Sequence, residues 1–309
     1  MKEIKNILIA GGGMMGKNIA FVFTKNPAYQ VGVYDMKDVD VAAGIRQNTS
    51  ELVAKGVLSP EELEERLSRI SFTTDPASPL LARADLVVEA VFEDMDVKRR
   101  TFAMLEARCR EDTIFCTNSS VMSPSLISRD LRKRERFVGT HFWNPGHLIP
   151  LVEVVKSDAT SDETAQTVME VLAGVGKEPV LCKKDVPGFI ANRMQHALWR
   201  EAISIVENGI ADAETVDKAV RYSFGLRLPQ LGPLTNSDMV GTELTWNIHS
   251  YILQFLEDSH EPSPLLAKMR EEGKMGFKSG EGFLSWTPEE VDKQNADLNE
   301  YLIRMLYGK

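Results

Sequence analysis

The feature that most constrains the fold is a glycine-rich segment directly after a short apolar run near the N-terminus. Residues 4–10 (IKNILIA) have the pattern of a short buried strand, and residues 11–16 (GGGMMG) follow at once. Residues 17–24 then have a helical pattern. Glycines at such a junction permit a tight turn and let backbone N–H groups at the helix N-terminus approach a phosphate. A strand, a glycine turn and a helix in this order are typical of the first unit of a doubly wound α/β domain.

Strand and helix patterns alternate along the first part of the chain. We expect further strands at 31–34, 70–73, 85–89, 113–117, 137–142 and 151–155, and helices at 40–56, 60–69 and 95–110. This alternation favours a mostly parallel, doubly wound sheet. After Pro187-Gly188 the strand patterns stop, and long helical patterns follow at 189–208, 212–222, 236–257 and 288–307. We therefore predict a dinucleotide-binding sheet domain at 1–186 and an all-helical domain at 187–309.

The composition excludes several classes of function. The 309-residue chain carries a net charge of −9, which disfavours non-specific binding to nucleic acid. Its three cysteines are sparse and odd in number, which indicates reduced thiols in a cytoplasmic protein, and they show no metal-ligand spacing. We see no signal peptide and no apolar run long enough to span a bilayer, so we expect a cytoplasmic protein without a metal or a membrane partner.

The glycine segment matches the dinucleotide-binding pattern G-x-G-x-x-G. Its residues are Gly11, Gly13, Met14, Met15 and Gly16. Asp35 ends the second expected strand, where a carboxylate can accept hydrogen bonds from a ribose 2′-hydroxyl and would repel a 2′-phosphate. The alternative is a plain strand–turn–helix connection. The combined features favour an NAD site.

A second segment, HFWNPGHLIPLVE at 141–153, indicates acid–base chemistry. His141 lies twelve residues ahead of Glu153, with the turn Asn144-Pro145-Gly146 between them. Such a turn can fold the second strand back beside the first, so that the carboxylate reaches the imidazole. A carboxylate fixes the tautomer of the ring and stabilises the imidazolium that forms. Glu153 also interrupts an apolar run, and a charge there needs a partner.

Taken together, the motifs resemble those of the 3-hydroxyacyl-CoA dehydrogenase family along essentially the whole chain. Besides the two segments above, they comprise VVEAVFEDMDVKRR at 87–100, TNSS at 117–120, DVPGFIANR at 185–193, LGPLTNSDMVG at 231–241 and GFKSGEGF at 276–283. The resemblance implies an NAD-dependent oxidation of a secondary alcohol in fatty acid metabolism. It also implies a dinucleotide-binding domain followed by a helical domain that builds a homodimer.

The resemblance assigns roles to individual residues. His141 matches the catalytic base and Glu153 its carboxylate partner. Ser120 matches a serine beside the nicotinamide of the cofactor and the substrate oxygen, and Asn192 matches an asparagine that lines the catalytic pocket; both would donate hydrogen bonds to the substrate oxygen. Glu93, Lys98, Asn144 and Lys278 match positions at the cofactor site, and Lys55 matches a lysine that contacts the CoA portion of the substrate. The alternatives are a turn serine, a helix-cap asparagine and a solvated loop lysine for Ser120, Asn192 and Lys278.

Some departures from the family bear on the substrate. Trp143 replaces the usual phenylalanine, and Asn48 stands where acyl-CoA enzymes often have a serine near the CoA. The extension at 287–309 resembles that of relatives acting on small hydroxy acids, such as carnitine or gulonate dehydrogenases. The basic run at 129–136 is either a solvated loop or a phosphate contact for CoA.

Three hypotheses follow for the function. The first is a 3-hydroxyacyl-CoA dehydrogenase, and the second is a dehydrogenase of the same fold acting on a free hydroxy acid. The third is an NAD-binding structural protein, which would not need an intact acid–base pair.

Overall fold

The computed structural model describes residues 3–308 and contains two compact units. The first unit comprises the chain up to Ala191 together with the segment from Leu298 on, and the second comprises Asn192–Asp297. Within residues 3–308, no helix is long and apolar enough to cross a membrane. The predicted division at residue 187 stays a prediction.

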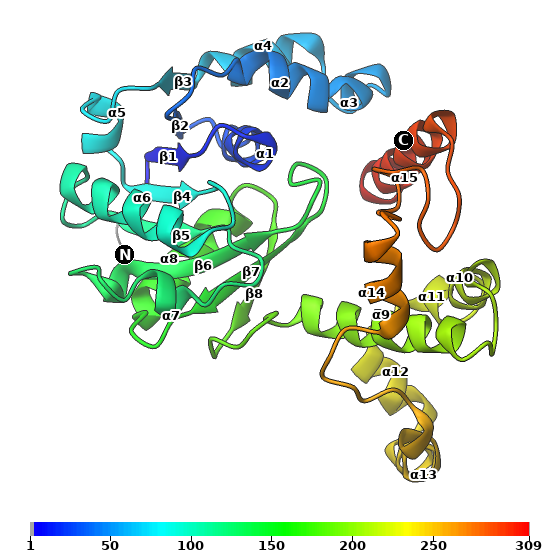
Figure 1. Cartoon of the computed structure of the whole chain (residues 1–309). Coiled ribbons are helices and arrows are strands. Elements are labelled where there is room, and N and C mark those ends of the chain that lie inside the picture. The colour runs from blue at the N-terminus through cyan, green and yellow to red at the C-terminus, as the bar shows by residue number, and fades with distance from the viewer. Residues whose placement is uncertain (1–2, 309) are drawn as a thin grey trace. The chain divides into compact units, whose positions relative to one another are not determined.

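The first unit is built on one sheet, which contains eight strands within the described residues (Figure 1). Its order is β3-β2-β1-β4-β5-β6-β7-β8, and all neighbours are parallel except β6 and β7. The strands are β1 (Asn6–Ala10), β2 (Gln30–Tyr34), β3 (Ile70–Thr73), β4 (Leu86–Glu89), β5 (Ile114–Thr117), β6 (Phe137–Phe142), β7 (Leu151–Lys156) and β8 (Glu178–Cys182). The predicted doubly wound, mostly parallel sheet is confirmed.

Helices cover both faces of this sheet. The helices of the first unit are α1 (Met14–Phe23), α2 (Val41–Asn48), α3 (Ser50–Ala54), α4 (Pro60–Ser68), α5 (Pro79–Ala82), α6 (Met95–Arg108), α7 (Pro124–Ile127) and α8 (Asp162–Ala173). Alternate residues of β1 point to opposite faces. Ile7 and Ile9 join the core formed with α1 and α8, whereas Leu8 joins the core formed with α6. Burial on both faces explains why the strands are continuous apolar runs.

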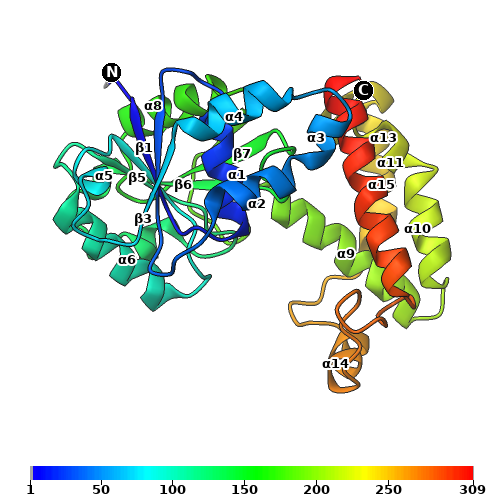
Figure 2. The same cartoon turned by 90° about the horizontal axis from the view of Figure 1, so that it is seen from above.

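The last helix returns to the first unit. Helix α15 (Pro288–Tyr307) ends against the helical hairpin, the name used here for α2–α4, residues 41–68 (Figures 1 and 2). Ile303 is 1% exposed and belongs to the same core as the hairpin residues Leu52 and Leu63. Lys55 forms an ion pair of 2.9 Å with Glu300. The C-terminal segment is therefore part of the dinucleotide-binding unit.

The second unit is helical. Its described helices are α9 (Ala191–Glu207), α10 (Ala213–Arg221), α11 (Phe224–Arg227), α12 (Pro233–Val240), α13 (Thr242–Ile252), α14 (Pro264–Glu271) and the first part of α15. Extended pairing among its described residues is limited to isolated bridges at Gly276, Glu281 and Ser285. The expected helical character of this part of the chain is confirmed.

Several details of the sequence-based assignment are wrong. The single helix expected at 40–56 is broken at Thr49, whose side chain bonds back to the carbonyl of Ile45. The single helix expected at 236–257 is broken at Gly241, which has a φ of 98° that helices exclude. Strand β8 and helix α8 were not predicted at all, although Ser161 caps α8 by accepting from the backbone N–H of Thr164.

Candidate active site

The two strands around the predicted turn place His141 directly opposite Glu153. They are register partners in the antiparallel β6–β7 pair, and His141 Nδ1 lies 2.8 Å from Glu153 Oε2. His141 is 5% exposed and Glu153 is 0% exposed. An ionised carboxylate can only accept, so the shared proton sits on Nδ1 and the lone pair is left on Nε2. The predicted contact is present, and its geometry leaves Nε2 as a base.

Glu153 is held by neutral donors as well as by the imidazole. Its Oε1 accepts from the backbone N–H groups of Ile190 and Ala191 at 2.9 and 3.0 Å, and its Oε2 accepts from Trp143 Nε1 at 3.3 Å. Burial alone would raise the pKa of Glu153, but the hydrogen bonds from His141, Ala191 and Ile190 together lower it. The carboxylate is therefore ionised at neutral pH.

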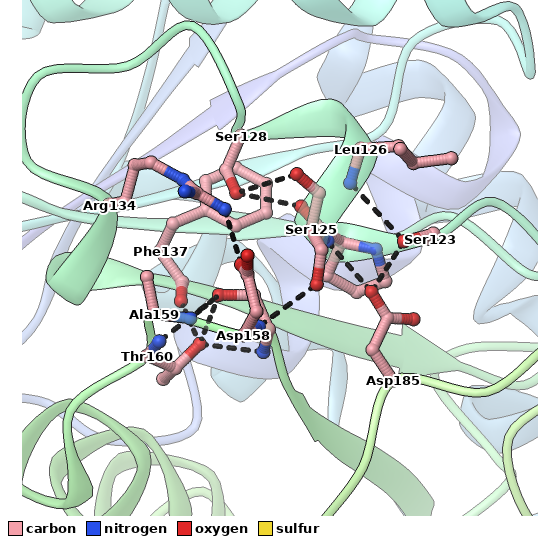
Figure 3. A network of polar contacts seen from close by, with 12 residues as sticks. Ser123, Ser125, Leu126, Ser128, Arg134, Phe137, Asp158, Ala159, Thr160 and Asp185 are labelled. Atoms are coloured by element: carbon pink, nitrogen blue, oxygen red, sulfur yellow. Dashed lines mark hydrogen bonds and ion pairs between the residues drawn. The ribbon is translucent and has the colours of Figure 1, made fainter.

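A polar anchor fixes the segment that supplies these backbone donors (Figure 3). Asp185 Oδ2 accepts from the hydroxyl of Ser123 and from the backbone N–H of Ser125, at 2.5 and 2.8 Å. Four residues later Phe189, at a φ of 50°, packs its ring 5.8 Å from that of His141. The sequence predicted a turn at Pro187-Gly188 and a role for Asn192, but it did not indicate that the backbone between them donates to Glu153.

A buried ionic network supports the loop that carries Ser120. Lys98 Nζ lies 2.8 Å from Glu89 Oε1 and 3.1 Å from Glu93 Oε2, and the side chains of Lys98 and Glu89 are 1% and 0% exposed. Glu93 Oε1 in turn accepts from the hydroxyl of Ser119 and, at 3.0 Å, from the backbone N–H of Ser120. Glu93 and Lys98 were predicted at the cofactor site. In the structure they orient the Ser119–Ser120 turn, and Glu89 is a member that sequence reasoning missed.

The glycine turn has the shape that a pyrophosphate needs. Gly11 has a φ of 113°, and a Cβ on Gly16 would lie 1.8 Å from the carbonyl oxygen of Gly11, so neither position accepts a side chain. A Cβ on Gly13 would meet nothing within 4 Å, which leaves open space at the start of α1. The first turn of α1 contains no acidic residue and its N-cap makes no side-chain hydrogen bond. The backbone N–H groups in the first turn of α1 can therefore bind an anionic ligand.

Asp35 lies at the end of β2 beside this turn. Its Oδ2 accepts from the backbone N–H of Gly12 at 2.7 Å, and its Oδ1 accepts from that of Lys37 at 2.9 Å. Of the two methionines in the motif, Met14 is 58% exposed, whereas Met15 packs against the core. Asp35 is thus a fixed acceptor at the edge of the glycine turn, as an NAD ribose requires.

The remaining predicted site residues lie apart from this group or in the second unit. Asn144 is exposed in the β6–β7 loop, and Asn48 Nδ2 donates to Asn18 Oδ1 at 2.7 Å. Lys55 is paired with Glu300. Asn192 and the exposed Lys278 belong to the second unit. The roles of all these residues stay predictions.

Comparison with known proteins places this geometry in context. The profile of the 3-hydroxyacyl-CoA dehydrogenase NAD-binding domain matches residues 6–186, and that of the C-terminal domain of the same enzymes matches residues 188–286. The mitochondrial hydroxyacyl-coenzyme A dehydrogenase of Homo sapiens is 34% identical over 292 residues, covering 92% of this chain and 91% of its own.

A second kind of relative matches the chain over its full length. The 5-formyl-3-hydroxy-2-methylpyridine 4-carboxylate 5-dehydrogenase of Mesorhizobium japonicum is 32% identical over 312 residues, covering 99% of both chains. A solved structure of a dehydrogenase with that activity, described as an NAD⁺-dependent dismutase, superimposes with a TM-score of 0.90 at 30% identity, covering 99% of this chain and 100% of its own.

Proposed function

Since the chain belongs to the 3-hydroxyacyl-CoA dehydrogenase family and is an NAD-dependent oxidoreductase acting on a CH–OH group, we propose that its substrate is a small free acid. This is the second of the three hypotheses above. It keeps the hydride chemistry of the family and replaces the CoA thioester by a free carboxylate.

The proposed mechanism uses the residues of the dyad. His141 Nε2 takes the hydroxyl proton while the carbinol carbon loses hydride, and Glu153 stabilises the imidazolium that forms. NAD, when bound, supplies the acceptor for the hydride. Ser120 and Asn192 donate to the substrate oxygen as charge develops on it. General base assistance of this kind contributes roughly 10²–10⁴-fold in rate.

The observation that carries the choice of substrate is the position of α15 on the helical hairpin. Lys55, which the family resemblance assigns to the CoA portion, lies 2.9 Å from Glu300, and Glu51 accepts from Asn299 Nδ2 at 3.3 Å. The C-terminal family profile ends at residue 286, before α15 begins. The hairpin residue expected to contact CoA is therefore already paired with a carboxylate of the chain's own C-terminal segment.

The basic run at 129–136 also favours the free acid. Arg132 pairs with Glu106 and Arg134 with Asp158, while Arg136 donates to the carbonyl of Glu111. Each of these guanidinium groups is thus held by a partner within the protein. The solvated-loop interpretation of this run fits better than a phosphate contact.

The relative from Mesorhizobium japonicum, which matches the chain over its full length, suggests a substrate class. Its name describes a pyridine ring with a free carboxylate and a formyl group. A hydrated formyl group is itself a CH–OH centre, so the same proton and hydride transfers oxidise it to a carboxylate. We therefore expect activity on a ring or short-chain carboxylate that carries a hydroxyl or a hydrated formyl group.

A substrate panel tests this proposal. NADH formation is measured with 3-hydroxybutyryl-CoA, free 3-hydroxybutyrate, carnitine, gulonate and a formyl-substituted pyridine carboxylate. We expect turnover of at least one free acid and none of the CoA ester. A kcat/KM for the CoA ester above that of every free acid would contradict the proposal. His141→Ala, which should lose turnover while still binding NAD, serves as the control for background reaction.

We also propose that the enzyme is a homodimer formed through its helical unit. Helix α13 and the turn after it expose large apolar side chains, including Trp246 at 73%, Tyr251 at 71% and Phe255 at 66%. Exposed apolar groups at this density are typical of a protein interface. Light scattering that gives the mass of a single chain at working concentration would refute the dimer.

A further inference from the structure

A cavity of about 310 Å³ lies within the first unit, away from the glycine turn. It is lined by the end of α1, the helical hairpin, the β6–β7 loop, the turn between α8 and β8, and the last residues of α15. None of its lining residues has a role in the proposed function. Cavities of this size accommodate small molecules.

The cavity is positively charged in an acidic protein. Its ionised lining residues are Lys25, Arg66 and Lys177 against the single carboxylate of Glu62, whereas the whole chain carries a net charge of −9. His147, also in the wall, adds no charge, because burial lowers its pKa to about 4. A concentration of one sign of charge inside a low-dielectric pocket attracts a ligand of the opposite sign.

Arg66 is largely satisfied within the protein. Its guanidinium donates to Thr24 Oγ1 at 3.1 Å, to the carbonyl of Phe21 at 2.9 Å and to Glu62 at 3.4 Å. It contributes charge to the cavity but few spare donors. The donors that remain for a ligand belong to the two lysines.

Lys177 is a buried ammonium with no carboxylate partner among residues 3–308. It is 6% exposed, and its Nζ donates to the carbonyls of Gly146 and Ile149 at 2.7 and 2.6 Å. Burial, and then the charge of Lys25, lower its pKa to about 8. A Cβ on Gly176 would lie 2.4 Å from Lys25 Nζ, so the second ammonium rests against the same turn. Lys25 is exposed whereas Lys177 is buried, so an anion between the two ammonium groups offsets mainly the cost of burying the charge of Lys177.

His147 offers the anion neither a charge nor an accessible acceptor. Its Nδ1 is fully buried, so an anion in the cavity cannot reach it. The anion is therefore held by the ammonium groups and not by the imidazole.

We propose that this cavity binds a small oxyanion of the phosphate type between Lys25 and Lys177. The bound anion would bridge the two ammonium groups. It would thereby hold Lys177 on the carbonyls of the loop that joins the dyad strands. The site is separate from the dyad and from the glycine turn, and the proposal does not depend on the substrate assigned above.

Isothermal titration of inorganic phosphate into the NAD-saturated protein, at constant ionic strength, tests the proposal. Saturating NAD blocks phosphate binding at the glycine turn. We expect saturable binding with a stoichiometry of one per chain. No saturable binding would overturn the proposal.

Variants locate the site. Lys25→Gln changes an exposed side chain and should fold, and Lys177→Met removes the buried ammonium. Each should weaken phosphate binding by at least about tenfold, the effect of losing one charge-assisted hydrogen bond. Lys218→Gln removes an exposed lysine of the second unit and should leave binding unchanged. Binding that survives Lys25→Gln at wild-type strength would refute the site even if Lys177→Met fails to fold.

Discussion

Replacing Glu153 by glutamine should convert His141 from a base into a ring that cannot accept the substrate proton. The side chain accepts at both ends, from Ile190 and Ala191 on Oε1 and from His141 and Trp143 on Oε2. In the glutamine variant, the single amide oxygen takes the position of Oε1, because two backbone N–H groups donate to that position. Its NH₂ group then faces His141 Nδ1, which must become the acceptor, so the ring proton moves to Nε2.

The magnitude of this effect follows from the loss of the correct tautomer. A general base contributes roughly 10²–10⁴-fold in rate, and a carboxylate-to-amide change that imposes the wrong tautomer lies at the upper end of that range. We therefore expect kcat of Glu153→Gln to fall by about 10³–10⁴-fold with little change in NAD affinity. Turnover of the best free acid and calorimetric NAD binding measure the two effects separately.

Trp143→Phe provides the matched control. It removes only the 3.3 Å bond to Glu153 and restores the residue that the family resemblance leads one to expect at this position. We expect less than about a tenfold change in kcat, because the charge and the 2.8 Å bond to His141 remain. Nitrogen NMR of the imidazole should find the proton on Nδ1 in the wild type and on Nε2 in Glu153→Gln. A glutamine variant with kcat within tenfold of wild type would refute this reasoning.

Three further outcomes test other parts of the structure. Lys98→Met leaves the buried Glu89 without its cation. The free energy of unfolding, measured in urea, should therefore fall by about 3–5 kcal/mol, and the double variant with Glu89→Gln should recover part of this loss. A loss below about 1 kcal/mol would show that Glu89 is not ionised. Asp35→Asn should lower kcat/KM for NAD by about tenfold and reduce the preference of the enzyme for NAD over NADP. Equal use of both cofactors by the wild type would contradict the role of this carboxylate. Burial, and then the charge of Lys177, lower the pKa of His147 to about 4, so between pH 6.5 and 4 the unfolded chain binds a proton that the folded chain does not. Acidification through that window should therefore lower the free energy of unfolding by up to about 3 kcal/mol, and His147→Gln should remove this dependence in pH-resolved denaturation.

The sheet and the dyad could be predicted from the sequence because the patterns that indicate them are local. A short apolar run bounded by glycine predicts a buried strand at 4–10, where the structure has β1, and a turn between two such runs predicts the pairing of β6 with β7. In that pairing a polar residue inside an apolar run, Glu153, indicates a partner across the strands. Each of these inferences needs only a few neighbouring residues.

The long-range contacts around the site could not be predicted in this way. Glu300 reaches Lys55 across 245 positions, and no pattern at either residue indicates the other. The backbone donors Ile190 and Ala191 carry apolar side chains, so their contribution to Glu153 is invisible in the sequence. Contacts of this kind depend on how distant elements pack.

The two buried carboxylates of the sheet differ in a way that separates a structural from a catalytic role. Burial raises the pKa of Glu89, and the buried ammonium of Lys98, 2.8 Å away, opposes this shift by offsetting its charge. Glu153 is surrounded by an imidazole and by neutral N–H donors, which lower its pKa without cancelling its charge. Its negative charge is therefore available when His141 becomes cationic, and the low-dielectric surroundings strengthen that interaction at the moment of proton transfer. A carboxylate already paired with lysine could not stabilise the imidazolium to the same extent.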